Sequence, residues 1–189
     1  MIFECGFSGK WLELLKQIAP GVTRAAVLRD FGNPAGIAQF GAIRAMASSI
    51  GVDVTPINVH ARDNAQDIER AVADFARSPN VGLIVTGSAT HGFHGDLIIT
   101  LAVRYKLPAV YSWRPMVTAG GLISYGPDSI DQYRHTAGYV DRILKGEKPA
   151  NLPVQAPTKY ELVINLKTAK SLRIEMPASV LTRADEVIE

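Results

Sequence analysis

Short apolar runs alternate with longer amphipathic segments along most of this sequence. The clearest run, residues 81–85, reads VGLIV and gives way to the small polar residues Thr86 and Gly87. A β-branched run without polar alternation is typical of a strand buried on both faces of a parallel sheet. Similar runs at residues 25–28 and 108–112 predict two further strands. Residues 52–59 alternate partly and contain Pro56, which predicts a strand near a sheet edge.

Apolar residues at helical spacing fill the segments between these strands. They predict helices over residues 8–19, capped by Ser8, over 35–50, closed by Gly51, and over 96–105. A further helix begins at Asp63 or Asn64 and ends near residue 78. This alternation predicts an α/β fold with a Rossmann-like, doubly wound parallel sheet and right-handed crossovers.

The pattern changes after residue 121. It predicts a brief strand over residues 122–125, a helix from Asp128 to Gly146, and a proline-rich linker over 147–158. A last strand over residues 161–166 and short helices over 168–172 and 179–189 complete the prediction. Residues 113–116 are expected to form the loop after the strand at 108–112.

Composition narrows the function classes. The 189 residues are 47% hydrophobic and 20% charged, as in a globular protein, and the net charge is only +2. Because the basic residues are scattered, nothing predicts a nucleic-acid partner. Cys5 stands alone, which excludes an internal disulfide and a cysteine-rich metal site. The phosphate-binding glycine motifs are absent, so no cofactor is predicted. No apolar run is long enough to span a membrane, and the first residues do not form a signal peptide.

Polar and aromatic residues follow several predicted strands, where open α/β sheets bind ligands. The candidate ligand-binding residues are Thr86, Ser88, Thr90, His91, Trp113, Arg114, Tyr125 and Asp128. Trp113 and Tyr125, with Tyr111, could stack on a planar ligand, and Arg114 could pair with a carboxylate.

Each of these candidate residues also has a structural interpretation that needs no ligand. Hydroxyls in the loop after residue 85 also suit an ordinary strand-to-helix turn, and Trp113 and Tyr125 equally suit core packing. Helix capping is favoured over ligand contact for Asp128, and Arg114 could be a solvated loop charge. Metal binding by His91 and His94 is disfavoured because glycines interrupt the segment.

Several segments together resemble one protein family. They are SGKWLELLK at residues 8–16 with APGV at 19–22, AGGLISYGPD at 119–128, PTKYELVINLKTAK at 157–170 and RADEVI at 183–188. These segments look like the second lobe of ABC-transporter substrate-binding proteins of the tryptophan/tyrosine type. Asn33, followed by Pro34, resembles the usual loop after the first strand of that lobe and joins the candidate ligand-binding residues.

The resemblance implies a type I periplasmic binding protein, in which two Rossmann-like lobes close on a solute. This chain then looks like the C-terminal lobe, formed by residues 1–121 and 151–189. Residues 122–150 would be a crossover strand and helix that pack on a missing N-terminal lobe. The apolar face of that helix, with Ile130, Tyr133, Ala137 and Val140, would lack its partner, which suggests a homodimer through the helix.

The resemblance also implies a permease and an ATPase as partners, an extracytoplasmic location, and no catalysis. Arg114 favours an acidic solute, such as an aromatic acid. Two other functions stay open: a small cytosolic α/β enzyme that uses His91 or Ser88, and a one-lobe ligand sensor. The solute-binding function is favoured because hydroxyls, amides and aromatic rings converge at the strand ends without a nucleophile-base pair.

Overall fold

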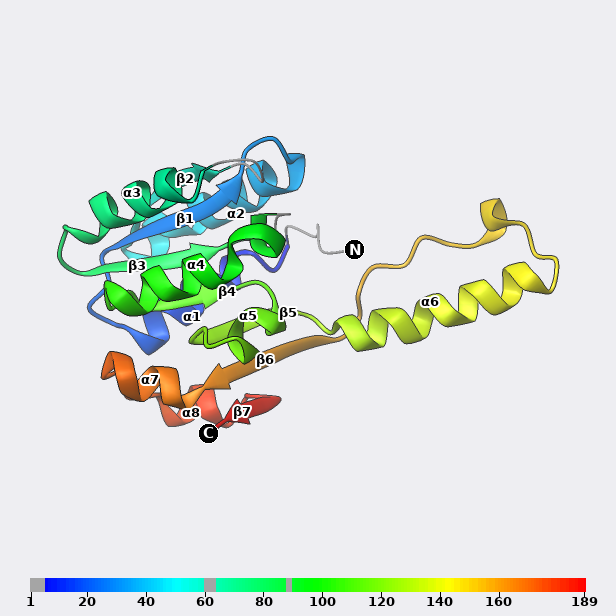
Figure 1. Cartoon of the computed structure of the whole chain (residues 1–189). Coiled ribbons are helices and arrows are strands. Elements are labelled where there is room, and N and C mark those ends of the chain that lie inside the picture. The colour runs from blue at the N-terminus through cyan, green and yellow to red at the C-terminus, as the bar shows by residue number, and fades with distance from the viewer. Residues whose placement is uncertain (1–5, 60–63, 88–89) are drawn as a thin grey trace.

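Helices and strands alternate along most of the computed structural model, which describes residues 6–59, 64–87 and 90–189, without the side chains of residues 90–93 (Figure 1). The elements in chain order are α1 (Gly9–Ile18), β1 (Arg24–Asp30), α2 (Pro34–Ile50), β2 (Asp53–Val59), α3 (Ala65–Ala76), β3 (Val81–Val85), α4 (Thr90–Arg104), β4 (Ala109–Tyr111), α5 (Arg114–Thr118), β5 (Ile123–Pro127), α6 (Ser129–Leu144), the 3-10 helix η1 (Pro149–Asn151), β6 (Tyr160–Asn165), α7 (Leu166–Leu172), α8 (Ala178–Leu181) and β7 (Glu186–Ile188).

One seven-stranded sheet, in the order β2-β1-β3-β4-β5-β6-β7, organises the chain. Strands β1 to β5 pair in parallel, so the predicted α/β doubly wound fold is confirmed. The strand order reverses between β1 and β3, because β2 lies on one side of β1 and the later strands lie on the other. In such sheets this point marks the crevice where ligands bind.

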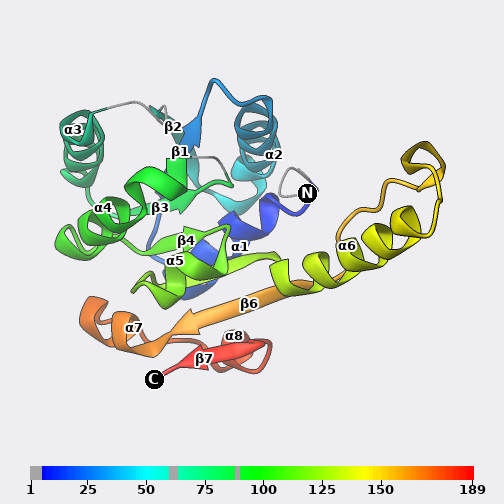
Figure 2. The same cartoon turned by 45° about the vertical axis from the view of Figure 1, so that its right-hand side comes forward.

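The sheet is covered on both faces. In β1, Ala25 and Val27 belong to the apolar cluster beneath α1 and α2, whereas Ala26 and Leu28 belong to the cluster beneath α3 and α4. Figure 2 shows these two helical layers on either side of the strands. All five residues of β3 are buried, which confirms the strand predicted from its unbroken apolar run. Pro56 lies in the edge strand β2, also as predicted.

Helix α6 leaves the body at the carboxyl end of β5. It projects away from the sheet together with the segment that returns to β6, so the two form an arm (Figures 1 and 2). None of the residues of α6 is buried. β5 itself lies inside the sheet between β4 and β6, so the departure from the body begins at Asp128. β6 runs antiparallel to β5, and the short β7 then pairs in parallel with β6.

Two predictions near the carboxyl edge were wrong. The fourth helix begins at Thr90 rather than residue 96, in spite of its glycines. A Cβ on Gly95 would lie 3.2 Å from the sulfur of Met116, so the small residue lets α4 approach α5. Residues 114–118 form α5 rather than a loop, because Pro115 in the first turn suits a helix start after the extended Trp113.

Two further predictions failed at the chain's outer parts. The Ser8 hydroxyl makes no capping bond to α1 and is buried without a hydrogen-bond partner. The helix predicted over residues 179–189 is instead α8 followed by β7, because residues 186–188 pair with β6. Within the described part of the chain, no helix is both long and apolar enough to cross a membrane.

Candidate functional site

Thr86 lies at the reversal point of the sheet, directly after β3. Its side chain is fully buried. Its backbone N–H and its hydroxyl both donate to the carbonyl of Leu28, at 3.1 Å and 3.0 Å respectively. Thr86 therefore ties the carboxyl ends of β1 and β3 together, and its hydroxyl already has a partner.

Asn33 begins α2 at the neighbouring strand end. Its side-chain oxygen accepts a hydrogen bond from the N–H of Ala35 at 3.0 Å, so Asn33 caps the helix. A Cβ on Gly36 would lie only 2.4 Å from the carbonyl oxygen of Asp30, which explains the glycine at this close approach. Phe31, in the turn between β1 and α2, is 47% exposed.

Three predicted residues of the next loop cannot be placed. Ser88 lies outside the described residues, and so do the side chains of Thr90 and His91, although their backbone belongs to α4. Their predicted contact with a ligand stays a prediction.

A groove of about 270 Å³ opens where β4, β5 and α6 meet. Trp113, directly after β4, and Tyr133, from the second turn of α6, contribute its aromatic surface. The lining residues are Ser112, Trp113, Pro127, Ser129, Gln132, Tyr133 and Thr136. The lining is uncharged and combines two aromatic rings with hydroxyl and amide groups, which is the chemistry of a small-molecule site.

Gly126 precedes Pro127 of the groove lining and lies against Ser112, another lining residue. A Cβ at this position would lie 2.1 Å from the carbonyl oxygen of Ser112, much closer than carbon and oxygen can approach. The glycine therefore allows the ends of β4 and β5 to lie side by side. This close approach brings Trp113 next to the first turn of α6.

Arg114 points away from the groove, toward the C-terminal strand. Its guanidinium pairs with the carboxylate of Glu186 in β7. Glu161 in β6 lies near the same guanidinium, and burial raises the pKa of this carboxyl in spite of the nearby positive charge. Arg114 is therefore engaged with the protein's own acidic groups.

Tyr125 belongs to an aromatic cluster beneath the sheet. Its ring stacks on Tyr160, with centroids 5.8 Å apart, and meets Phe7 edge-on at 6.2 Å. Its carbonyl accepts a hydrogen bond of 2.7 Å from the indole N–H of Trp11. Tyr111 is buried in the opposite cluster, and this burial raises the pKa of its phenol. The core-packing alternative thus describes the observed contacts of Tyr125.

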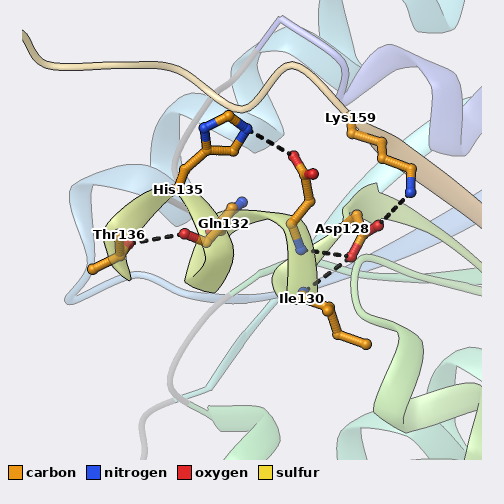
Figure 3. A network of polar contacts seen from close by, with 7 residues as sticks. Asp128, Ile130, Gln132, His135, Thr136 and Lys159 are labelled. Atoms are coloured by element: carbon orange, nitrogen blue, oxygen red, sulfur yellow. Dashed lines mark hydrogen bonds and ion pairs between the residues drawn. The ribbon is translucent and has the colours of Figure 1, made fainter. Parts of the chain in front are cut away.

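Asp128 lies where the arm meets the body, between the end of β5 and the start of β6. One oxygen of its carboxylate accepts from the N–H groups of Ile130 at 3.0 Å and Asp131 at 3.1 Å, and thus caps α6 (Figure 3). The other oxygen lies 3.0 Å from Nζ of Lys159, just before β6. The hydrogen bond from Lys159, followed by the one from Asp131, lowers the pKa of Asp128 below its ordinary value.

The structure therefore does not bring all the predicted site residues together at one place. Trp113 lines the groove, Asp128 lies beside it as a helix cap, and Asn33 and Thr86 serve the strand ends nearby. Arg114 and Tyr125 face other parts of the body. In the part of the chain that the structure describes, no three His, Cys, Asp or Glu side chains come together as metal ligands.

Sequence reasoning missed the half of the groove that α6 provides. Ser129, Gln132, Tyr133 and Thr136 all belong to the first two turns of this helix. A signal was present: a helix that starts directly at a strand's carboxyl end overhangs the neighbouring strand ends with its first turns. The sequence pattern places Tyr133 only on the apolar face of the helix.

Comparison with known proteins identifies the class. A family model described as ABC transporter substrate binding protein matches residues 8–188. A solved structure described as an ABC domain in complex with L-Trp, from Streptococcus pneumonia, is 28% identical with a TM-score of 0.84, and the match covers 96% of this chain and 60% of that one. A conserved domain protein from Vibrio cholerae gives 26% identity and a TM-score of 0.83, with 95% and 60% covered.

A third structure shares the fold. A ligand-free, open substrate-binding protein with adhesive properties from Clostridium difficile is 21% identical with a TM-score of 0.68, covering 95% of this chain and 59% of that one. The search of curated proteins found no match. The mostly parallel sheet with flanking helices and these neighbours give a type I periplasmic binding protein-like α/β fold. The chain belongs to the ABC transporter substrate-binding protein family, and it spans about 60% of the length of these solved relatives.

Proposed function

We propose that this protein is the solute-binding component of an ABC importer, and that it binds an aromatic solute in the groove between Trp113 and Tyr133. The observation that carries the proposal is the meeting of two aromatic rings with uncharged polar groups at the carboxyl ends of β4 and β5. An indole or phenol ring would stack on the aromatic surfaces, while hydroxyl and amide groups at the rim orient it.

The solute's charged groups need other partners, because the groove's lining is uncharged. For Arg114 to bind a carboxylate, as the sequence predicts, its guanidinium would have to leave Glu186. The complex of the Streptococcus relative contains L-Trp, which supports an aromatic amino acid as the solute class. We therefore propose an aromatic amino acid or aromatic acid whose ring, rather than its charge, provides the main contact with this part of the protein.

The proposed partners follow from the family. A permease and an ATPase would complete the importer, and the protein would act outside the cytoplasmic membrane. No chemical change of the solute is proposed. The enzyme alternative depends on Ser88 and His91, which lie outside the described side chains, and no observation on the described residues favours catalysis.

Calorimetric titration of the 189-residue chain tests the proposal. L-Tryptophan, an aromatic carboxylic acid without an ammonium group, and L-leucine are titrated separately. We expect the two aromatic compounds to bind and leucine to bind much more weakly. Trp113→Ala removes the larger stacking surface and should weaken binding about tenfold or more. Tyr133→Ala should act in the same direction.

Leu144→Ala is the matched control, since Leu144 is an exposed apolar residue at the far end of the same helix. It should leave binding of the aromatic compounds unchanged. No heat of binding with either aromatic compound, or equal loss in Leu144→Ala and Trp113→Ala, would contradict the proposed site.

A further inference from the structure

Arg114 attaches the short helix α5 to the C-terminal strand. Nη2 of its guanidinium donates to the carboxylate of Glu186 in β7, and the two groups form an ion pair. Nε of Arg114 is buried and has no hydrogen-bond acceptor among the described residues. Glu161 in β6 is close enough for its carboxyl to be influenced by the positive charge, but the described contacts include no hydrogen bond between the two side chains. The attachment of Arg114 therefore depends mainly on Glu186.

This attachment is important because α5 is too short to hold its own position. The helix has only five residues, and the side chain of Trp113 makes no capping hydrogen bond at its start. A helix of this length gains little from its own hydrogen bonds, so tertiary contacts decide where it lies. Near its end, the side-chain amide of Asn165 donates to the carbonyl of Val117 at 3.2 Å. At its start, the Arg114–Glu186 pair provides the corresponding contact.

Trp113 is joined directly to the first turn of α5. Its backbone is extended, with φ −141° and ψ 128°, and leads straight into Arg114. Its side chain lines the groove and packs against the apolar cluster beneath α3 and α4. Neither Arg114 nor Glu186 is among the residues that line the groove. A displacement of the first turn would move the indole as well, because one rigid peptide unit joins Trp113 to Arg114.

We infer that Arg114, held by Glu186, is a positioning residue that fixes Trp113 at the groove, so that the C-terminal strand supports the solute site from outside it. Binding sites need such support, because a side chain that contacts a ligand keeps its geometry only if the residues behind it hold it in place. The effect on solute binding rests on the proposed function. The effect on the position of Trp113 does not.

Glu186→Gln is the decisive variant. Glu186 lies in β7, outside the groove, so we expect its replacement to reach Trp113 through Arg114. The chain has two tryptophans, and Trp11 is fully buried in the other apolar cluster, where it serves as an internal reference. In NMR spectra of the solute-free protein, the indole N–H signal of Trp113 should move in Glu186→Gln and in Arg114→Met. The signal of Trp11 should stay unchanged.

Calorimetric titration with L-tryptophan measures the consequence for binding. A partly exposed ion pair sets the scale, so Glu186→Gln should weaken binding about threefold to fivefold. Arg114→Met should weaken binding at least as much, because it also removes the attraction between Arg114 and Glu161. The double variant should bind no more weakly than Arg114→Met, since Glu186 acts through Arg114.

Arg104→Met is the matched control. Arg104 pairs with Glu69 at 2.6 Å, which links α4 to α3, and neither residue lines the groove. This variant also loses one ion pair between two elements, but it should change neither the Trp113 signal nor the affinity. Circular dichroism verifies that each variant is folded.

An unchanged Trp113 signal in Glu186→Gln would overturn the inference. So would an equal loss of affinity in Arg104→Met, or a double variant in which the two single losses add in full. A Trp113 signal that moves without any change in affinity would overturn the role of the pair in solute binding. If the natural chain does not bind L-tryptophan, the proposed function fails, and the Trp113 signal alone then decides whether Arg114 is a positioning residue.

Discussion

Asp128 is the residue whose replacement should most directly loosen the arm. Its carboxylate satisfies the N–H groups of Ile130 and Asp131, at 3.0 Å and 3.1 Å, and pairs with Lys159 at 3.0 Å. Its own N–H donates to the carbonyl of Lys159, also at 3.0 Å. The start of α6 and the start of β6 are therefore held together at one residue.

The magnitude follows from these contacts. Asp128→Ala removes the helix cap, which typically costs about 1 kcal/mol. That corresponds to an increase of about fivefold in the population in which the first turn of α6 is open. Asp128→Asn keeps an oxygen that can accept from the two N–H groups and loses only the charge. Because the Lys159 side chain is 58% exposed, solvent screens the ion pair, and the Asn variant should be affected less.

Lowering the pH should loosen the start of α6, as Asp128→Ala does. The pKa of Asp128 is lower in the folded state than its ordinary value of 3.8. Its contribution to stability is therefore fully present above that value and is lost as the pH falls through the folded-state pKa. In Asp128→Asn this part of the pH dependence should be missing.

Hydrogen exchange of the amides of Ile130 and Asp131 is the assay, because a local opening of the arm need not change global unfolding. Exchange should be fastest in Asp128→Ala, intermediate in Asp128→Asn and slowest in the natural protein. Asp74→Ala, at an exposed position of α3, is the control. Equal exchange rates in Asp128→Ala and the natural protein would refute the reasoning.

Three other substitutions test the body of the protein. Thr86→Val removes a buried hydroxyl that donates at 3.0 Å, and should lower the free energy of unfolding in urea by about 1 kcal/mol. Gly126→Ala places a Cβ 2.1 Å from the carbonyl of Ser112 and should lower the melting temperature more than Thr86→Val does. A double-mutant cycle with Arg114→Met and Glu186→Gln should give a coupling energy below about 1 kcal/mol, because both side chains are partly exposed.

The sequence predicted the sheet well because burial leaves a direct pattern. The run at residues 81–85 has only apolar residues and glycine, since β3 is covered on both faces. Pro56 identified an edge strand because proline cannot donate a ladder hydrogen bond. Gly51 closed α2 in the left-handed conformation, as a glycine after a helix often does.

The short elements could not be predicted in the same way. β7 is only three residues long, so no period is visible, and its existence depends on pairing with β6. For the site, the residue types were informative but their directions were not. Arg114 and Trp113 are neighbours in the chain, yet one pairs with Glu186 and the other lines the groove. Tertiary contacts alone decide such directions.

The most direct test of the central claim is to map the bound solute on the chain by backbone amide chemical shifts. At saturating L-tryptophan, we predict the largest shifts at Ser112, Trp113 and the first two turns of α6, where the groove lies. Shifts confined to the amino ends of β3 and β4, around Asn80 and Lys106, or no shifts at any accessible concentration, would contradict a solute site at the carboxyl ends of the strands.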